Sequence, residues 1–368
     1  MKTCIMTITL IAIVFFSLAC SHLTPPVDKK ALNEKNGSAK IEQVASFQGQ
    51  QVTGLTVSQD GRIFASFPRW RSDVNNSVVE IKPDGTVTPY PNQEWNNWSG
   101  SPRADGFTSV QAVMAHGDSL FVLDPSNVEM KGVIGHATLF EFNLKTNSLV
   151  RKWVFNAVAA PPRSYLNNFR IDDARSLVYI TDSGLGALVV LNEDTGDVRR
   201  LLEQHPSTKS EPITLYPNGK PLTKSNGLPR RVNADGIEFA DDYVYYHATT
   251  GTHLYRIPAE ALADTSLTSD QLAMKVQNLG KTPPPDGLIV DKQTNTIYMA
   301  DLENKSVVYR APDASIHTLV KDEGLHWADT FAIDLQRKLL FTDSRLDQVH
   351  PGDSANGYLF HIYRVGLQ

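Results

Sequence analysis

The chain has 368 residues, of which 20% are charged and 41% hydrophobic, and its formal net charge is −5. Acidic and basic residues are mixed along the sequence, so there is no basic face for nucleic acid and we expect no DNA or RNA partner. The length alone would allow two domains, but closed β architectures often occupy such a length as one unit.

The first twenty residues predict an export signal. Lys2 is followed by an apolar run over residues 5–18 and then by Ala19-Cys20, a segment too short for a comfortable membrane span. Cys20 suggests a bacterial lipoprotein, in which this thiol is lipidated, although Ser17 stands three positions earlier where Leu is usual. Ordinary cleavage and secretion is the alternative. We therefore expect an exported monomer, anchored in the periplasm or outer membrane only through a lipid at Cys20, or secreted.

Cys4 is the only other cysteine and also lies in this leader. A mature chain would then have no disulfide, and neither a cysteine nucleophile nor a thiolate metal ligand is available to it. Residues 21–40 are polar and lack an apolar period, which predicts a flexible tether. The folded domain is expected over residues 41–368.

A short sequence motif recurs six times along this domain, at intervals of roughly 43 to 68 residues. It consists of a polar residue, an apolar alternation, a turn and a β-rich run that ends near Asp. A repeat of several short strands is typical of a propeller blade, because a lone four-stranded sheet cannot bury its faces without neighbours. The sequence therefore predicts an all-β fold, a six-bladed β-propeller with four-stranded blades around a central channel.

The repeats also indicate where the ring closes. Residues 41–47 are expected to pair with the last blade, which removes free sheet edges. Long insertions fall at residues 95–106, 156–165 and 202–232, and we expect them to lie over one mouth of the channel. The blades are predicted to start near Gln51, Gly106, Tyr165, Ala234, Pro285 and Ala328.

Each copy of the motif begins with a polar residue, and the alignment of the repeats places these six residues at one level of the channel. These residues are Thr53, Thr108, Asn167, Asp235, Asp286 and Asp329. Three carboxylates converging there would repel one another unless a cation or protons offset their charge. The sequence thus predicts a metal site made of Asn167, Asp235, Asp286 and Asp329, suited to Ca²⁺ or Mg²⁺, with no organic cofactor.

Two simpler interpretations stay open. The Asp-Gly and Asp-Thr pairs are also common turn residues, so the recurrence could reflect turns alone. A second set of aspartates closes the second strand of several blades, and we expect these side chains to cap turns or accept backbone hydrogen bonds. This set comprises Asp124, Asp182, Asp301 and Asp343.

Several other side chains are candidates for chemistry at the channel. His326 precedes Asp329 closely and could act as a general base, although a structural role is the alternative. Aromatic residues could form a lip that stacks a flat or cationic ligand, or could simply pack between blades. The aromatic candidates are Trp70, Trp95, Trp98, Tyr165 and Trp327.

Four stretches resemble the major royal jelly protein/yellow family. They cover residues 177–191, 198–207, 235–239 and, most specifically, 244–258, which reads VYYHATTGTHLYRIP. The resemblance extends over most of the chain from about residue 50. It implies a six-bladed propeller, usually secreted, whose members include nutritive proteins, amine binders and proteins linked to dopachrome conversion. The chain departs from the insect pattern in lacking the disulfide cysteines.

More distantly the chain is similar to gluconolactonase and regucalcin-like propellers, which hold a divalent metal in the channel. The similarity implies metal ligands at Asp235 in Ala234-Asp235-Gly236 and at Asp286 in Pro285-Asp286-Gly287. It places Asn167 and Asn168 on the substrate side. The glutamate ligand of that group aligns with Thr53, so one metal ligand is missing.

Three functions remain open from the sequence. The first is a propeller that binds a small aromatic or cationic molecule at the channel mouth through Asn167, Asn168 and the aromatic lip. The second is a divalent-metal-dependent hydrolase of lactones or esters, with Asp286, Asp235 or His326 as the catalytic base. The third is a non-catalytic surface scaffold. Whether the protein is an enzyme is left open by these alternatives.

Overall fold

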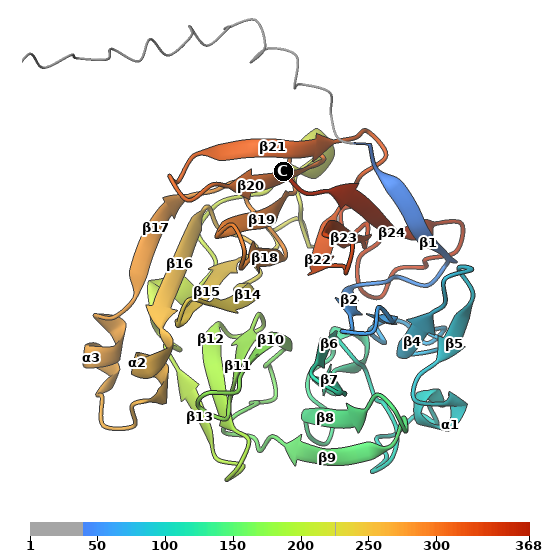
Figure 1. Ribbon diagram of the computed structural model, residues 1–368, viewed down its shortest axis with the longest axis horizontal. Helices are drawn as coiled ribbons and strands as arrows, with labels where there is room; N and C mark the ends of the chain where they lie inside the picture. Colours follow the sequence, from blue (N-terminus) through green and yellow to red (C-terminus); the bar gives the residue numbers. More distant parts are fainter. Residues whose placement is uncertain (1–39, 225) are drawn as a thin grey trace, which may run out of the picture. The chain divides into compact units, whose positions relative to one another are not determined.

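The computed structural model describes residues 40–224 and 226–368, and these residues form a six-bladed β-propeller (Figure 1). This architecture confirms the predicted fold class. The predicted signal segment, residues 1–20, and all but the last residue of the predicted tether, 21–40, lie outside the described residues. Within the described part of the chain, no helix has the length and apolar character needed to cross a membrane.

Every blade is a four-stranded antiparallel sheet. From the inside outwards, blade 1 contains β2 (Gly54–Val57), β3 (Ile63–Ser66), β4 (Val78–Ile81) and β5 (Val87–Pro89). Blade 2 contains β6 (Ala112–His116), β7 (Ser119–Asp124), β8 (Thr138–Asn143) and β9 (Leu149–Val154). Blade 3 contains β10 (Leu166–Asp172), β11 (Leu177–Asp182), β12 (Ala187–Asn192) and β13 (Val198–Leu201).

The second half of the ring repeats this pattern. Blade 4 contains β14 (Ala234–Ala240), β15 (Tyr243–Ala248), β16 (His253–Pro258) and β17 (Gln277–Lys281). Blade 5 contains β18 (Leu288–Asp291), β19 (Thr296–Asp301), β20 (Ser306–Arg310) and β21 (Ile316–Lys321). Blade 6 contains β22 (Ala328–Ile333), β23 (Lys338–Asp343), β24 (Leu359–Gly366) and β1 (Glu42–Gln48).

Blade 6 closes the ring because its outermost strand comes from the beginning of the domain. Strand β1 pairs antiparallel with β24, so both ends of the domain are held in one sheet. This pairing confirms the closure predicted for residues 41–47. The short helices are α1 (Gln93–Asn96), α2 (Ala259–Ala263) and α3 (Ser269–Ala273), and α3 begins with a capping box between Thr268 and Gln271.

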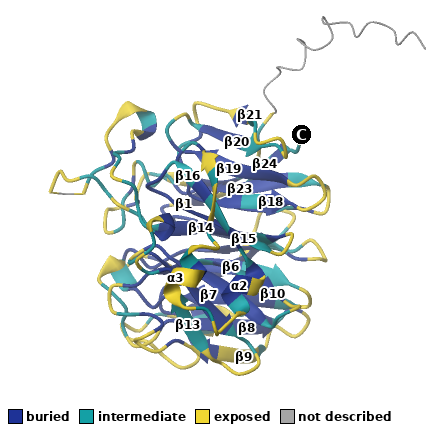
Figure 2. Cartoon of the chain, turned by 90° about the vertical axis from the view of Figure 1, so that its left-hand side faces the viewer, coloured by how far each residue is buried: buried dark blue, intermediate teal, exposed yellow. Residues whose placement is uncertain are grey.

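The hydrophobic core lies between the blades, with one buried cluster at each of the six interfaces. Between blades 2 and 3, for example, Phe121 and Leu139 lie in one cluster with Phe169 and Val178. Both faces of a blade are therefore covered, which explains why a middle strand such as β11 is buried at every position. Figure 2 shows the strands largely buried and the exposed residues concentrated on loops and on α3.

A set of side-chain hydrogen bonds ties neighbouring blades together close to the axis. In each case a hydroxyl on the second strand donates to a backbone carbonyl of the next blade. The pairs are Ser66 Oγ to Gln111 O (2.8 Å), Thr181 Oγ1 to Asp235 O (2.5 Å) and Thr342 Oγ1 to Thr53 O (2.8 Å). The last of these joins blade 6 to blade 1, where the ring closes.

We expect Thr342→Val to destabilise the propeller by about 1–3 kcal/mol, because it leaves the buried carbonyl of Thr53 and the N–H of half-buried Thr330 without partners. The hydroxyl of Thr342 donates to Thr53 O and accepts from the N–H of Thr330 at 3.0 Å. Urea unfolding followed by tryptophan fluorescence measures the change. Thr86→Val is the control, since Thr86 is exposed and its hydroxyl bonds only to Asp84 in a turn. Equal midpoints for the two variants would contradict the expectation.

Candidate functional site

Bulges at the start of the innermost strands aim polar side chains at the axis. The pairing register shifts between Leu166 and Phe169 in β10, between Ala234 and Ile237 in β14, and between Ala328 and Phe331 in β22. A bulge places two residues opposite one and redirects their side chains. The bulged pairs are Asn167-Asn168, Asp235-Gly236 and Asp329-Thr330, which fall at the same place in three blades.

The structure brings together four of the residues that the sequence singled out. Asn167, Asp235, Asp286 and Asp329 line one cavity of about 80 Å³, and each is at most 6% exposed. Approximate rotational symmetry thus gathers side chains that are far apart in the sequence. The cavity mouth includes Arg230 and Leu222 from the insertion at residues 202–232, which therefore reaches the mouth as expected.

One half of the cavity is a network of amides around Asp235. The Nδ2 of Asn167 donates to Asp235 Oδ2 at 2.6 Å, and the Nδ2 of Asn168 donates to Asp235 Oδ1 at 3.1 Å. The Oδ1 of Asn167 accepts from Gln111 Nε2 at 3.1 Å and from Asn168 at 3.2 Å. Both oxygens of Asp235 are thus held by neutral donors.

The other half is organised around Asp286. The indole Nε1 of Trp327 donates to Asp286 Oδ2 at 2.5 Å, and the hydroxyl of Thr249 donates to Asp286 Oδ1 at 3.1 Å. Asp329 is held more weakly, by the hydroxyl of Thr330 at 3.5 Å. Among the described residues, none of the three carboxylates of the cavity forms an ion pair with a cationic side chain.

Burial without a counter-charge raises the pKa of all three carboxyl groups. Burial raises the pKa of Asp286 to about 6. For Asp235, burial and then the nearby Asp286 and Asp329 hold the pKa well above its ordinary value. For Asp329, burial and then Asp286 have the same effect on the pKa. The cluster is therefore poised to exchange protons or to accept an external cation near neutral pH.

Aromatic side chains form part of the cavity wall. Trp70, Tyr165 and Trp327 line it, and the Nε1 of Trp70 donates to the Tyr165 hydroxyl at 2.8 Å. That hydroxyl donates in turn to Gln111 Oε1 at 2.7 Å, which connects the aromatic wall to the amide network. Rings fixed by hydrogen bonds beside carboxylates are suited to an organic cation.

A buried histidine lies directly behind the acidic residues. A Cβ added at Gly236 would lie 2.5 Å from His247 Nε2 and 2.6 Å from Asp286 O, so the imidazole occupies the gap between blades 4 and 5. Burial lowers the pKa of His247 to about 4, which keeps the ring neutral. Neither ring nitrogen has a hydrogen-bond partner among the described residues. This residue could not be singled out from the sequence, because a lone histidine in a buried strand has no distinctive pattern.

Two residues of the predicted ring do not contribute to the cavity. Thr53 lies at the expected level, but its hydroxyl is directed towards Gln111 O at 3.4 Å. Thr108 lies three residues before the ring position of blade 2, and its N–H donates to Asp124. Gln111 takes the place of Thr108, because blade 2 enters its innermost strand without a bulge and the spacing shifts. Its position directly before the apolar alternation was the available signal.

The other aromatic candidates lie elsewhere. Trp95 packs edge-on against Phe140 and Phe142 in the cluster between blades 1 and 2, which is the packing alternative considered from the sequence. Trp98 is half-buried under the guanidinium of Arg69, 5.5 Å from the ring centroid. Neither tryptophan lines the acidic cavity, so the placement of these two in one lip with Trp70 is corrected.

His326 faces a different hollow from its neighbour Trp327. Its Nδ1 lies 3.3 Å from Asp347 Oδ2 and 2.9 Å from Gln348 Nε2, and all three residues line a separate surface pocket. The placement of His326 beside the acidic residues is therefore corrected, because the segment before β22 directs the side chains of His326 and Trp327 into separate pockets. The aspartates at the ends of the second strands accept backbone hydrogen bonds, as Asp124 does from Thr108 and Ser109.

The arrangement does not fit a preformed divalent-metal site. Among the residues that the structure describes, no group of three His, Cys, Asp or Glu side chains has the arrangement of a metal site. The Oδ1 of Asn167 already accepts two hydrogen bonds, and the indole of Trp327 directs an N–H at Asp286. A metal ion would have to displace these donors before it could be ligated.

The fold and this cavity define a six-bladed propeller with a buried acidic and aromatic pocket at one end of its axis. A likeness to solved propellers supports the fold. A gluconolactonase from Xanthomonas campestris has a TM-score of 0.54 at 11% identity, covering 92% of both chains. A calcium-binding regucalcin from Agrobacterium tumefaciens has a TM-score of 0.52 at 14% identity, covering 87% of this chain and 91% of that one.

Sequence comparison identifies the family. The family model of the major royal jelly protein matches residues 108–354, and the chain belongs to this family. Protein yellow of Drosophila erecta is 24% identical over 180 residues, which cover 45% of this chain and 33% of that protein, and protein yellow of Drosophila yakuba matches equally. The match thus spans about a third of the length of these relatives. The expected family membership is confirmed.

Proposed function

We propose that this propeller binds a small organic cation, such as a primary amine with a flat apolar body, in the acidic cavity. The observation that carries the proposal is the convergence of three buried carboxylates with no cationic partner among the described residues. Burying a carboxylate without a counter-charge costs free energy, and a bound ammonium group would supply the missing charge. Trp70, Tyr165 and Trp327 would contact the body of the ligand.

Tyramine and 4-ethylphenol make a suitable pair of probes, because they differ only in the aminoethyl charge. We expect calorimetry at pH 7 to give saturable binding of tyramine and none of 4-ethylphenol. Asp286→Asn should weaken tyramine binding by tenfold or more, since it removes a charged hydrogen-bond acceptor worth about 1.5–3 kcal/mol. Asp194→Asn, in an exposed hairpin, is the control and should bind as the wild type.

Binding should also strengthen as the pH rises through about 6, because that is where Asp286 loses its proton. Equal affinity for both probes, or an unchanged affinity in Asp286→Asn, would overturn the proposal. The export and lipid anchor predicted from residues 1–20 would place such a binder in the cell envelope, and fractionation of Cys20→Ser tests that part separately.

The second candidate is a divalent-metal-dependent hydrolase of lactones or esters. It is favoured by the same three carboxylates, which are the hard ligands that Ca²⁺ and Mg²⁺ prefer. The hydrogen bonds to Asn167 and Asp286 count against it. A stabilisation of the fold by Ca²⁺ that Asp286→Asn abolishes, without any tyramine binding, would favour this candidate over the first. If neither probe nor metal binds, a non-catalytic scaffold remains.

A further inference from the structure

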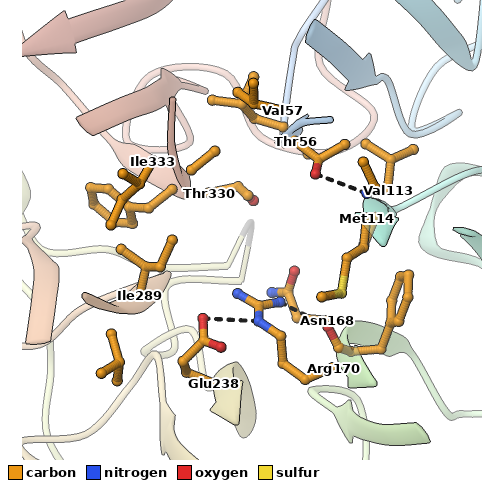
Figure 3. Close-up of a pocket in the computed structure, with 18 of the residues that line it drawn as sticks. Thr56, Val57, Val113, Met114, Asn168, Arg170, Glu238, Ile289, Thr330 and Ile333 are labelled. Carbon is orange, nitrogen blue, oxygen red and sulfur yellow. Dashed lines mark hydrogen bonds and ion pairs between the residues drawn. The ribbon is translucent and has the colours of Figure 1, made fainter. Parts of the chain in front are cut away.

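The propeller has a second cavity at the other end of its axis (Figure 3). Its volume is about 360 Å³, within the range of small-molecule sites, and residues of all six innermost strands line it. Neighbouring bulge residues face the two cavities, with Asn167 and Asp329 on the acidic side and Asn168 and Thr330 on this side. The hydrogen bond from Asn168 to Asp235, at 3.1 Å, forms part of the partition between them.

The walls of this second cavity combine apolar and polar side chains. Figure 3 shows Met114 reaching towards the centre of the ring from one side, and Ile289 and Ile333 facing it from the other. The apolar lining includes Val57, Val113, Met114, Ile289, Phe331 and Ile333. These apolar side chains suit the body of a hydrophobic ligand, and the charged residues among the lining can orient its polar end.

The polar end would meet Arg170, whose guanidinium extends towards the centre of the cavity (Figure 3). Its Nε donates to Glu238 Oε2 at 3.0 Å and its Nη1 donates to Phe169 O at 2.8 Å. Its Nη2 has no hydrogen-bond partner among the described residues. Each oxygen of Glu238 already accepts one hydrogen bond, because its Oε1 accepts from the N–H of Phe239 at 3.0 Å. The pair therefore offers a free N–H donor of Arg170 to a ligand, beside a carboxylate whose charge Arg170 already offsets.

The charged side chains of the lining also favour a ligand with a carboxylate. Three cationic side chains face two carboxylates, because Arg337 pairs with Asp291, Arg170 pairs with Glu238, and exposed Lys292 is the additional cation. A guanidinium with free N–H groups recognises carboxylates well. We propose that this cavity is a second ligand site, for a small molecule with an apolar body and a single carboxylate, separate from the acidic cavity.

Two probes that share the same phenylpropyl body test the proposal: 3-phenylpropionate and 3-phenylpropanol. Calorimetry on the wild-type domain should give saturable binding of the carboxylate, at least tenfold tighter than the alcohol. Met114→Trp, which fills the cavity, should abolish that binding. The double variant Arg170→Gln/Glu238→Gln removes both charges together, leaves no unpaired buried charge, and should also weaken binding by at least tenfold.

The matched control is Val150→Trp, which adds the same side chain at an exposed site on the outermost strand β9. All variants should keep the tyramine binding and urea midpoint of the wild type. A negative result for the carboxylate site can therefore be distinguished from a negative result for amine binding in the acidic cavity. If 3-phenylpropionate does not saturate the wild type, the cavity holds only water and the proposal is wrong. Equal binding of the alcohol, or undiminished binding by Met114→Trp or by the double variant, would also overturn it.

Discussion

Gly287→Ala is expected to destabilise the propeller by about 3 kcal/mol or more, near the upper end of the cost of overpacking a core. A Cβ on Gly287 would lie 1.9 Å from the carbonyl oxygen of Asp329, and 3.4 Å from the ring of Phe331. The obstacle is backbone and cannot rotate away. Blades 5 and 6 would have to separate, and the closed ring transmits that separation to its other interfaces.

The urea midpoint, followed by circular dichroism and tryptophan fluorescence, measures this loss. Gly366→Ala is the matched control, because the nearest atom to its added Cβ is the side-chain Nζ of Lys338 at 3.9 Å. We expect the control to unfold with the wild type and Gly287→Ala to unfold at much lower urea or to remain insoluble. A Gly287→Ala variant with a wild-type midpoint would show that the blades are not in contact at this level.

Asp286→Asn is expected to act in the opposite direction and to stabilise the ligand-free protein by on the order of 3 kcal/mol at pH 7. Asp286 has a pKa of about 6 in the folded protein, against 3.8 ordinarily. In the wild type, the contribution of protonated Asp286 to the free energy of unfolding is therefore fully present below about pH 4. This contribution is lost as the pH rises through about 6. The amide removes this loss and also relieves the repulsion on Asp235 and Asp329.

Unfolding curves at pH 4, 5, 6 and 7 test this sign. The gain in stability of Asp286→Asn over the wild type should be small at pH 4 and should grow to its full size by pH 7. An asparagine retains the contacts with Trp327 and Thr249, so packing changes little. A variant that is less stable than the wild type at pH 7 would mean that the carboxylate contributes to the fold. When the removal of a side chain stabilises the ligand-free protein but weakens ligand binding, that side chain usually belongs to a functional site.

The fold could be predicted because every blade has the same pattern of apolar alternation and turns. A period-two alternation followed by a turn specifies strands, and the number of copies specifies the number of blades. Asn167, Asp235, Asp286 and Asp329 could be aligned because each stands directly before or within the entry to an innermost strand. The closure by residues 41–47 followed from the need to remove a free edge.

The remaining site residues depend on features that a repeat alignment does not contain. The bulge is present in blade 3 and absent from blade 2, which moves the ring position from Thr108 to Gln111. His326 and Trp327 are adjacent in sequence, yet they face separate pockets. The second cavity is built by residues further along the same strands, mostly three or four positions beyond the acidic site, and its Arg170–Glu238 pair joins two blades.

The three buried carboxylates of Asp235, Asp286 and Asp329 are expected to bind a cation that displaces protons from them. Calorimetry of tyramine binding at pH 6, in buffers of different ionisation enthalpy, measures this exchange directly. Asp286 is about half protonated at that pH, so we expect a net release of protons on binding, which Asp286→Asn should reduce. Saturable binding with no proton release, or proton release unchanged in Asp286→Asn, would contradict it.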